Sequence, residues 1–503
     1  WNRRPGKAMT KMTDESLKEE ILINVTPSEV RAALLENGVL QEVYVERTAR
    51  RGLISNIYKG RVLRVLPGMQ AAFIDIGLDR TAFLHASDIA KNGVPENSDD
   101  VPNIRDLVRE GDEIMVQVVK DPLGNKGARL TTYITLPSRH LVLLPRSDSV
   151  GVSARIEDEE ERERLRGMVE ELLAENELSC GAIVRTVAEG AERDAIAADL
   201  RYLIRLWDVV QERCSKSSVK ALVHEDLSLP LRVLRDMVTG DVERVLVDSK
   251  SDFEAMQEFA NTYLPDAAPA IELYQRRRPI FDLHGIEDEI RKSLDRNIPL
   301  KSGGYLIFDH TEAMTTIDVN TGGYVGHRNL EETIYRTNLE AAVAIARQLR
   351  LRNLGGIIII DFIDMEEADH RNNVLQVLEQ ALSRDHARHQ ITPVSPLGLV
   401  EMTRKRTRES LQHVLCEDCP SCEGRGFVMT AETVCFEIFR EIIRQSRQFE
   451  FDEVMVLANE GVIELLLDEQ ARSLAELAEQ TGKSIRLQTE ALYLQDQFDV
   501  VLM

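Results

Sequence analysis

A strand–helix–strand pattern in the middle of the chain limits what that region can fold into. Residues 313–320 (AMTTIDVN) and 355–365 (GGIIIIDFIDM) have the length and β-branched content of buried strands. Between them, residues 330–353 repeat apolar side chains at helical spacing, such as Leu339 and Val343, before two glycines end the helix. A unit of this kind predicts two neighbouring parallel strands in an α/β layer.

Each of these two predicted strands ends in an aspartate, Asp318 in the first and Asp361 in the second. Because ligands bind beyond the carboxyl ends of such strands, we expect the two carboxylates to converge and to bind Mg²⁺. Asn320 lies on the same face as Asp318 and can hold a carboxylate or a phosphate oxygen. Asp364 is a further candidate. The alternative is that these aspartates only cap helices or form turns.

A cysteine cluster occupies residues 416–426, which read CEDCPSCEGRG. Cys419 and Cys422, with glycines after them, form half of a zinc knuckle and supply two of the four ligands that tetrahedral zinc needs. Three interpretations remain open: Cys416 and His413 complete the shell in the same chain, a second chain donates its own pair, or the motif is redox-active. The glycine-rich flank disfavours redox chemistry. The missing ligands favour a zinc ion shared between two chains, and hence a dimer.

The chain is acidic, because 62 lysines and arginines oppose 85 aspartates and glutamates, for a net charge of −23. Binding to nucleic acid must therefore depend on local basic patches or on divalent metal. Residues 40–135 contain short β-branched runs separated by turns, which is typical of a small β-barrel. Tyr58, Phe73 and Phe83 alternate there with cations, as in surfaces that stack single-stranded nucleic acid, and Lys126 lies on a glycine loop. The alternative is that the aromatic residues belong to the barrel core.

Together and in this order, these pieces closely resemble the ribonuclease E/G family, from about Ile21 to Met503. The most specific segments are NIYKGRVLRVLPGMQAAFIDIG, LKSGGYLIFDHTEAMTTIDVNTG, LRNLGGIIIIDFIDM, GLVEMTRKRTRESL and CPSCEGRG. The resemblance implies a multidomain α/β and β protein whose parts are an S1 (OB-type) β-barrel at 45–133, an RNase H-like fold from 21–44 and 230–293, a 5′-sensor region at 134–229, a DNase I-like α/β catalytic domain at 294–414, a zinc link at 415–427 and a small α/β C-terminal domain at 428–503. Residues 1–20 are expected to be a disordered leader or a non-native extension.

The resemblance also implies roles for individual residues. Asp318 and Asp361 match two magnesium ligands and Asn320 their supporting amide, so these three are the expected catalytic residues. Cys419 and Cys422 match a link in which two chains share one zinc ion. The residues expected to contact RNA are Phe73, Phe83 and Lys126. The residues expected to recognise a 5′-phosphate are Arg185, Thr186, Arg388 and Val142. Ser138, in the same region, stands where other members have a glycine.

The implied function is that of a Mg²⁺-dependent endoribonuclease. It would hydrolyse single-stranded, AU-rich RNA, preferably with a 5′-monophosphate, to 5′-phosphate and 3′-hydroxyl ends. The implied partners are an rRNA precursor (at the 5′ end of 16S rRNA), mRNA and a second copy of the chain, in a homodimer or a tetramer. No apolar run reaches the ~20 residues of a membrane span, and no signal peptide is visible, so a cytoplasmic location is expected. The alternatives are a non-catalytic S1-type RNA-binding protein with a structural zinc and a metal-dependent DNA phosphodiesterase.

Overall fold

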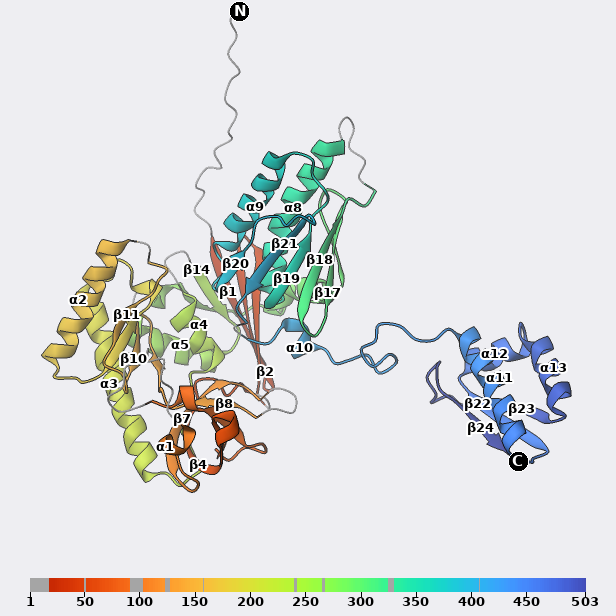
Figure 1. Cartoon of the computed structure of the whole chain (residues 1–503). Helices are drawn as coiled ribbons and strands as arrows, with labels where there is room; N and C mark the ends of the chain where they lie inside the picture. The colour runs from red at the N-terminus through yellow and green to blue at the C-terminus, as the bar shows by residue number, and fades with distance from the viewer. Residues whose placement is uncertain are drawn as a thin grey trace, which may run out of the picture. The chain divides into compact units, whose positions relative to one another are not determined.

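A computed structural model describes the fold for residues 18–48, 51–90, 103–122, 127–156, 158–238, 242–264, 267–323, 330–406 and 408–503. The chain forms two compact units, Trp1–Leu411 and Gln412–Met503, and each has its own core. The sheets and helices of both are labelled in Figure 1. In the described residues, no helix is both long enough and apolar enough to span a membrane.

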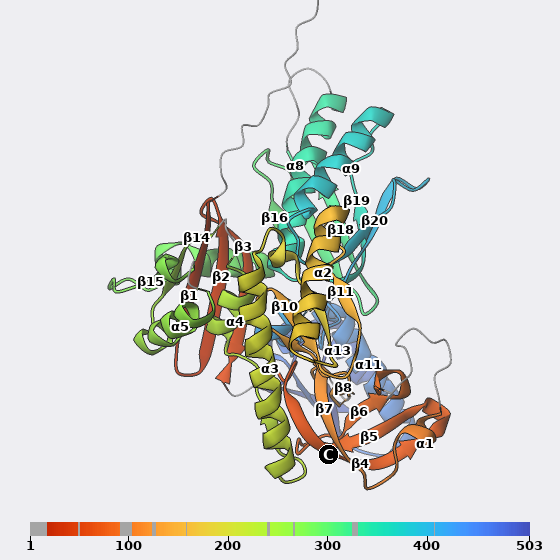
Figure 2. The same cartoon turned by 90° about the vertical axis from the view of Figure 1, so that its left-hand side faces the viewer.

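The first sheet of the large unit joins segments that are far apart in the sequence. Its strand order is β15–β14–β1–β2–β3, with bounds Ile271–Leu273, Val242–Val247, Glu19–Val25, Glu29–Glu36 and Val39–Arg47. β1 pairs antiparallel with β2 but parallel with β14, so the N-terminal strands and the later ones form one sheet (Figure 2). The helices around it are α4 (Leu229–Asp236), α5 (Lys250–Tyr263), α6 (Ile280–Leu283) and α7 (Ile286–Leu294).

Five strands close a small β-barrel. Their order around the barrel is β4 (Ile57–Leu66), β5 (Ala71–Asp75), β6 (Ala82–His85), β8 (Arg129–Thr131) and β7 (Glu113–Lys120), and β7 pairs back onto β4. β13 (Leu222–His224) adds to the outside of β4, and α1 covers Ile104–Leu107. The predicted barrel is thus confirmed. Of the two interpretations of Tyr58, the alternative is confirmed, because Tyr58 is buried in the barrel core.

The region after the barrel is a four-stranded sheet covered by two long helices. Its order is β11–β12–β10–β9, with bounds Val150–Val152, Gly181–Val184, Leu141–Leu144 and Leu136–Pro137. The helices α2 (Glu159–Glu175) and α3 (Arg193–Lys216) share one core with Leu141, Leu143 and Val184. Alternate residues such as Val142 point to the opposite face, where they stay partly exposed.

The last sheet of the large unit contains the strand–helix–strand pattern. Its order is β16–β17–β18–β19–β21–β20, with bounds Asn297–Pro299, Tyr305–His310, Met314–Asn320, Gly356–Asp361, Leu399–Arg404 and His389–Ile391. Only β18 and β19 pair in parallel. α8 (Leu330–Leu351) and α9 (Ala368–Leu382) lie side by side and cover one face of this sheet (Figure 1).

The apolar repeat of α8 faces the sheet at every member but one. Ala346 and Leu349 are buried and Leu339 packs against the core, whereas Val343 is 53% exposed. The buried face also contains Ile345 and two polar residues, Thr337 and Asn338, that are completely buried. Small and polar side chains let the helix approach the sheet closely, which an apolar periodicity does not reveal.

The small unit is an α/β domain that follows the short helix α10 (Leu411–Leu415). Its sheet order is β23–β22–β24, with bounds Ser484–Thr489, Glu453–Ala458 and Phe498–Leu502. Its helices are α11 (Ala431–Gln448), α12 (Glu460–Leu467) and α13 (Ala471–Thr481). Val434, Ile438, Val454 and Val456 are fully buried between them, so this unit has a core of its own.

Candidate functional site

Asp318 and Asp361 are direct neighbours across the parallel pair β18–β19. The register of the two strands pairs Asp318 with Asp361, one step after Ile317 with Ile360. Ile317 and Ile360 are buried under α8 and α9, so the alternation along a strand turns both aspartates to the opposite, exposed face. Neighbouring strands lie about 4.8 Å apart, which puts both carboxylates within reach of one cation. The predicted convergence of these two residues is confirmed.

Two further contacts define the charge and the orientation of this pair. The side-chain amide of Asn320 donates a hydrogen bond to Asp318 Oδ2 at 2.8 Å, as one of the sequence interpretations expects. Partial loss of hydration, together with the negative charges of Asp318 and Asp364, raises the pKa of Asp361 above its ordinary value. The aspartates therefore repel one another, and a cation between them would relieve this repulsion.

The donor set fits Mg²⁺ in chemical terms. Mg²⁺ is commonly held by one or two carboxylates and completes its shell with water and substrate oxygens. Throughout the described ranges, no three His, Cys, Asp or Glu side chains are placed to hold one metal ion. Asp318 and Asp361 are a pair of carboxylates on an exposed sheet face.

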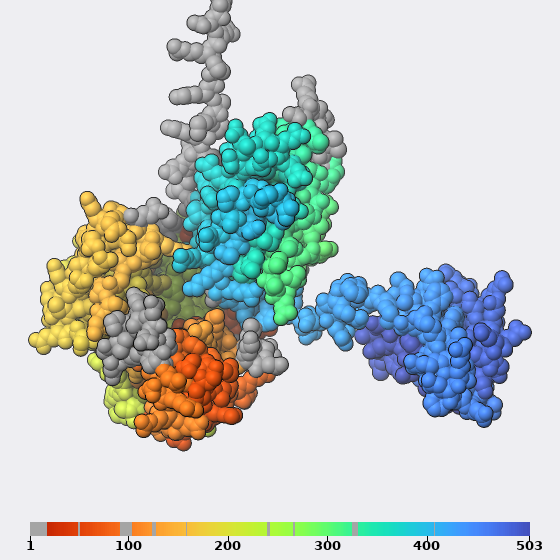
Figure 3. All heavy atoms as spheres, viewed as in Figure 1, coloured from red at the N-terminus to blue at the C-terminus, as the bar shows by residue number. Residues whose placement is uncertain are grey.

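A second cluster lies on the outer face of the barrel. Phe73 and Phe83 are cross-strand partners on β5 and β6, with ring centroids 6.4 Å apart and an angle of 68° between the planes. Arg64 pairs with Phe73 in the register, and Arg129 pairs with Phe83. Both rings are only half-buried, because Ile74 and Leu84 fill the interior instead. Spheres in red and orange mark the barrel residues on the face shown in Figure 3.

Two cations that the sequence places near these rings have other partners. Lys59 and Arg61 both form ion pairs with Glu113, at 3.3 and 3.1 Å. Lys126, the third residue expected to contact RNA, lies outside the described residues. Of the predicted surface, the structure brings Arg64, Phe73 and Phe83 together. Arg129, which the sequence analysis did not single out, extends this row beside Phe83 and also forms an ion pair with Asp88 at 2.8 Å.

A third cluster surrounds Arg185 at the end of β12. Its guanidinium donates to the carbonyl oxygen of Ser138 at 2.5 Å and pairs with Asp236 at 2.8 Å. Ser138 is buried, and its hydroxyl donates to Asp199 at 2.6 Å, so its side chain turns into the protein. Burial alone would raise the pKa of Asp199, but hydrogen bonds from His140 and Ser138 lower it below the ordinary value. Asp199 accepts hydrogen bonds from the Ser138 hydroxyl and the His140 N–H, and it thereby fixes the segment whose carbonyl oxygen Arg185 contacts.

The other residues expected around Arg185 lie on two neighbouring segments. The Thr186 and Ser153 hydroxyls are 2.9 Å apart. Arg155, which follows on the same segment, donates hydrogen bonds to the backbone carbonyl oxygens of His386 and, at 3.4 Å, Asp385. These bonds attach the loop that carries the exposed Arg388 to the segment of Ser153 and Arg155. The same segment contacts Thr186 through Ser153. Val142 is partly exposed on β10, the strand paired with β12.

In the small unit, the cysteine pair has the backbone geometry of a thiolate turn. The backbone N–H groups of Cys422 and Ser421 hydrogen-bond Cys419 and lower the pKa of its thiol. The N–H of Gly426 donates to Cys422 Sγ at 3.4 Å, and Gly424 and Gly426 adopt φ of +82° and +80°. The turn therefore favours the thiolate of Cys419, which is the form of cysteine that zinc binds. The closure by Cys416 and His413 is not formed among the described residues.

Three family models match most of the chain. The sequence model of the S1 RNA binding domain matches residues 54–132, that of the Ribonuclease E/G family matches residues 135–407, and that of the RNase E/G thioredoxin-like domain matches residues 418–502. The chain belongs to the ribonuclease E/G family. The predicted family and S1 domain are thereby confirmed.

Individual members of the ribonuclease E/G family match nearly the whole chain. Ribonuclease G of Escherichia coli (strain K12) is 55% identical over 489 residues, which cover 96% of this chain and 99% of that protein. Ribonuclease G of Haemophilus influenzae is 54% identical over 490 residues, with the same coverage. Ribonuclease E of Escherichia coli (strain K12) is 37% identical over 459 residues, which cover 90% of this chain but 43% of that protein. The chain is thus more similar to these ribonuclease G members than to ribonuclease E.

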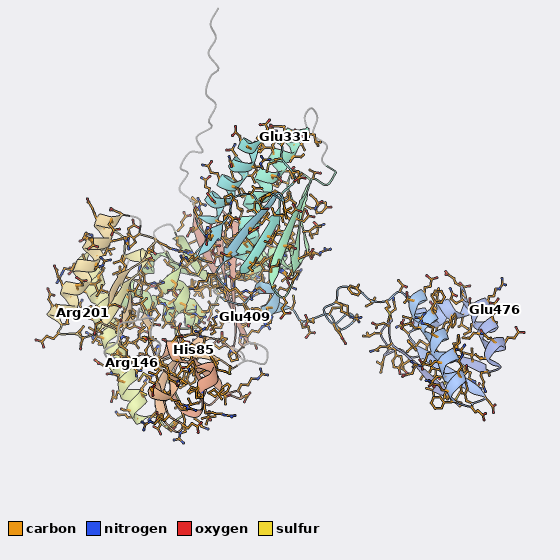
Figure 4. The ribbon with its side chains drawn as sticks, in the orientation of Figure 1. His85, Arg146, Arg201, Glu331, Glu409 and Glu476 are labelled. Atoms are coloured by element: carbon orange, nitrogen blue, oxygen red, sulfur yellow. The ribbon has the colours of Figure 1, made fainter. Side chains whose placement is uncertain are left out.

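Three further residues of the barrel cluster and of the cluster around Arg185 were not predicted from the sequence. His85 lies on the outer face of the barrel, with its ring centroid 6.4 Å from that of Phe83 (Figure 4). The alternation of β6, which places Phe83 outside and Leu84 inside, could have indicated it. No comparable signal indicates Arg155 or Asp236, because their partners are far away in the sequence.

Proposed function

We propose that this endoribonuclease hydrolyses internal phosphodiester bonds of single-stranded RNA at a magnesium ion held by Asp318 and Asp361, and leaves 5′-phosphate and 3′-hydroxyl ends. Endoribonuclease activity is that of the family to which the chain belongs. The single observation that supports the metal site best is the register pairing of the two aspartates on one exposed sheet face.

The residues of this chain would divide the work as follows. Asp318 and Asp361 would hold the cation, and Asn320 would keep Asp318 in the orientation its hydrogen bond defines. When bound, Mg²⁺ supplies Lewis-acid stabilisation of the phosphoryl oxygens and lowers the pKa of water. Both aspartates are exposed, so they are accessible to an RNA strand. The attacking group would be water, so the 2′-hydroxyl would remain intact.

The reaction class is tested with one labelled oligonucleotide. A 5′-monophosphorylated, AU-rich RNA should be cut in Mg²⁺ and left intact in EDTA, and the DNA of the same sequence should resist. RNA binding without turnover would favour a non-catalytic RNA-binding protein. Equal cleavage of the DNA would favour a general phosphodiesterase.

We propose the barrel row Arg64–Phe73–Phe83–Arg129 as the surface that binds the RNA strand, and we propose Lys126, which lies outside the described residues, as a further RNA-binding residue. Half-exposed rings between two arginines offer stacking and phosphate contacts together, which an acidic chain needs in a local patch. The match to the S1 RNA binding domain over residues 54–132 supports this assignment.

Replacing Phe83 by leucine tests the stacking directly. Leucine keeps apolar volume against Phe73 but removes the aromatic face, and stacking contributes about 1–3 kcal/mol per base. We expect RNA affinity, measured by fluorescence anisotropy in EDTA, to fall by roughly 5- to 100-fold with little change in melting temperature. Wild-type affinity in Phe83→Leu would remove Phe83 from the proposed surface.

We propose the cluster of Arg185, Thr186, Arg388 and Val142 as a sensor of the 5′-monophosphate. Arg185 and Thr186 would bind the phosphate, Arg388 would close the pocket, and Val142 would pack on the terminal base. The bonds from Arg155 to the loop that carries Arg388 support this assignment, since they join the two segments that supply the ligands.

Replacing Arg185 by alanine should abolish the preference for 5′-monophosphorylated over 5′-hydroxyl RNA and leave the cleavage of 5′-hydroxyl RNA unchanged. The reason is that, of the two substrates, only the 5′-monophosphorylated RNA would offer Arg185 a phosphate for a charge-assisted hydrogen bond. The measurement is the ratio of kcat/KM for the two substrates. Arg193→Ala, which breaks an exposed ion pair with Glu175 in the same region, is the matched control. A preference that survives in Arg185→Ala would misplace the sensor.

We propose that Cys419 and Cys422 bind a zinc ion shared with a second chain, in a homodimer or a dimer of dimers. The lowered pKa of Cys419 supports thiolate chemistry at this turn. In the same proposal, the sheet of β1–β3, β14 and β15 is the RNase H-like part, residues 134–229 contain the sensor, and the β16–β21 sheet with α8 and α9 is the DNase I-like catalytic part. The proposed cellular role is maturation of the 5′ end of 16S rRNA and decay of mRNA in the cytoplasm.

A further inference from the structure

Asn338 is a completely buried amide in the middle of α8. Its side chain makes a pair of hydrogen bonds with the backbone of Ile363: Asn338 Nδ2 donates to the carbonyl oxygen at 2.7 Å, and the Ile363 N–H donates to Asn338 Oδ1 at 3.1 Å. The amide thereby satisfies both backbone groups of one residue, as a neighbouring strand would. A buried amide without hydrogen-bond partners is strongly unfavourable, so these two hydrogen bonds tie the position of Ile363 to that of Asn338.

The residue that Asn338 holds lies just beyond the proposed metal ligand. β19 ends at Asp361, which is also the last residue of that strand to pair with β21, opposite Leu399. The strand ladder therefore no longer fixes Ile363, and the side chain of Asn338 takes over this task.

The same turn of α8 contacts the end of the other aspartate strand. Thr337 is completely buried and packs on Gly304, where an added Cβ would lie 3.2 Å from Thr337 Cγ2 and 2.5 Å from the carbonyl oxygen of Asn320. Thr337 thus lies against the backbone beside Asn320, and Asn338 lies against the backbone beyond Asp361. One turn of α8 therefore lies against the backbone near the ends of both β18 and β19.

We propose that Asn338 is a positioning residue for the pair Asp318–Asp361. It fixes the backbone two residues after Asp361, and this fixes the direction of the Asp361 carboxylate relative to that of Asp318. The inference rests on the proposed function, because it assumes that these two aspartates bind the cation. It adds a residue that touches neither cation nor RNA and that acts only through the main chain.

The experiment measures cation binding without RNA. Mn²⁺ binds the same oxygen ligands as Mg²⁺ and can be followed by the electron paramagnetic resonance signal of the free ion. Asp361→Asn should abolish Mn²⁺ binding at this site. We expect Asn338→Ala to weaken Mn²⁺ binding at the same site by about tenfold or more. In steady-state kinetics, kcat should fall by a similar factor, while KM for RNA stays within twofold of the wild-type value.

A matched control separates positioning from general destabilisation. Asn353 is also buried, follows the C-terminal end of α8, and donates hydrogen bonds to the carbonyl oxygens of Arg408 and Glu409. Asn353→Ala should lower the melting temperature to a comparable extent but leave Mn²⁺ affinity unchanged. Equal Mn²⁺ affinities in wild type and Asn338→Ala would overturn the inference.

A second variant covers the case in which Asn338→Ala does not fold. Asn338→Asp keeps the volume and the acceptor for the Ile363 N–H but loses the donor, and its added negative charge would by itself strengthen cation binding. Weaker Mn²⁺ binding in Asn338→Asp supports the inference, and wild-type or tighter binding overturns it. If Asp361→Asn itself retains Mn²⁺ binding and cleavage, the proposed function fails instead, so the two failures are distinguishable.

Discussion

Replacing Asp318 or Asp361 by asparagine is expected to lower kcat by about three orders of magnitude, which corresponds to roughly 4 kcal/mol of lost transition-state stabilisation. Asparagine keeps the shape of the side chain but removes the negative charge that a hard divalent cation requires. The measurement is single-turnover cleavage of a 5′-monophosphorylated RNA at saturating enzyme. Both variants should bind this RNA as tightly as the wild type, because the proposed RNA surface lies on the barrel.

The matched control is a carboxylate on the same sheet. Asp309, on β17, pairs with Arg296 at the surface, and its register partner on β18 is Thr316, one alternation before Asp318. Asp309→Asn should therefore cleave RNA at close to the wild-type rate. Full activity in Asp318→Asn or Asp361→Asn would contradict the catalytic assignment, and equal losses in all three variants would indicate a general effect of charge.

Replacing Cys419 by serine is expected to remove the zinc ion and to dissociate the dimer. The wild type should contain one zinc per two chains, and Cys419→Ser almost none, since serine does not replace a thiolate ligand. Structural zinc sites contribute about 10–16 kcal/mol in small domains, so the loss of one ligand should be decisive. By light scattering, the mass should fall to that of a single chain, 56.9 kDa.

Cys416→Ser is the matched control for this prediction. Cys416 is exposed and close in sequence, but it stands outside the proposed pair. Cys416→Ser should keep both the zinc and the dimer mass. A loss of zinc from Cys416→Ser equal to that from Cys419→Ser would instead favour closure within one chain. A Cys419→Ser protein with unchanged mass would refute the shared-metal dimer.

The sequence predicts the central pair well because two strong local rules act together. Period-two alternation decides which face each strand residue occupies, and a single helical crossover makes consecutive strands parallel neighbours. Asp318 and Asp361 follow from these rules without knowledge of the rest of the fold. Phe73 and Phe83 follow from alternation alone, and so does the burial of Tyr58, which lies on the same face of β4 as Val62.

The contacts that organise the site are harder to predict, because their partners are distant in the sequence and polar. Asn338 breaks the apolar pattern of α8, and only the structure reveals that its partner is the backbone of Ile363. The C-terminal end of α8 is likewise fixed by a polar contact with residues that are distant in the sequence. Arg350 is buried against Glu36 at 2.8 Å and Glu42 at 3.1 Å, on strands from the N-terminal sheet. A helix-dipole argument explains an arginine near that end but not this ion pair.

The arginines at and after the end of β21 also make contacts that the sequence does not predict. Arg404 is buried and forms a bidentate ion pair with Asp385, and Arg408 lies over the ring of Tyr44 at 3.6 Å. Burial would raise the pKa of Asp385, but the hydrogen bonds and the charge of Arg404 lower it. By itself, a basic run of this kind is usually a solvated face. In the structure, these two arginines hold the loop before Arg388 and join two sheets.

The most direct test of the catalytic pair is an anomalous difference map from crystals soaked in Mn²⁺ with a short, uncleavable RNA. One Mn²⁺ peak should lie about 2.1 Å from an oxygen of Asp318 and from an oxygen of Asp361, with a phosphate of the RNA beside it. A cation that contacts neither carboxylate, or carboxylates turned away from one another in the presence of RNA, would contradict the proposed centre.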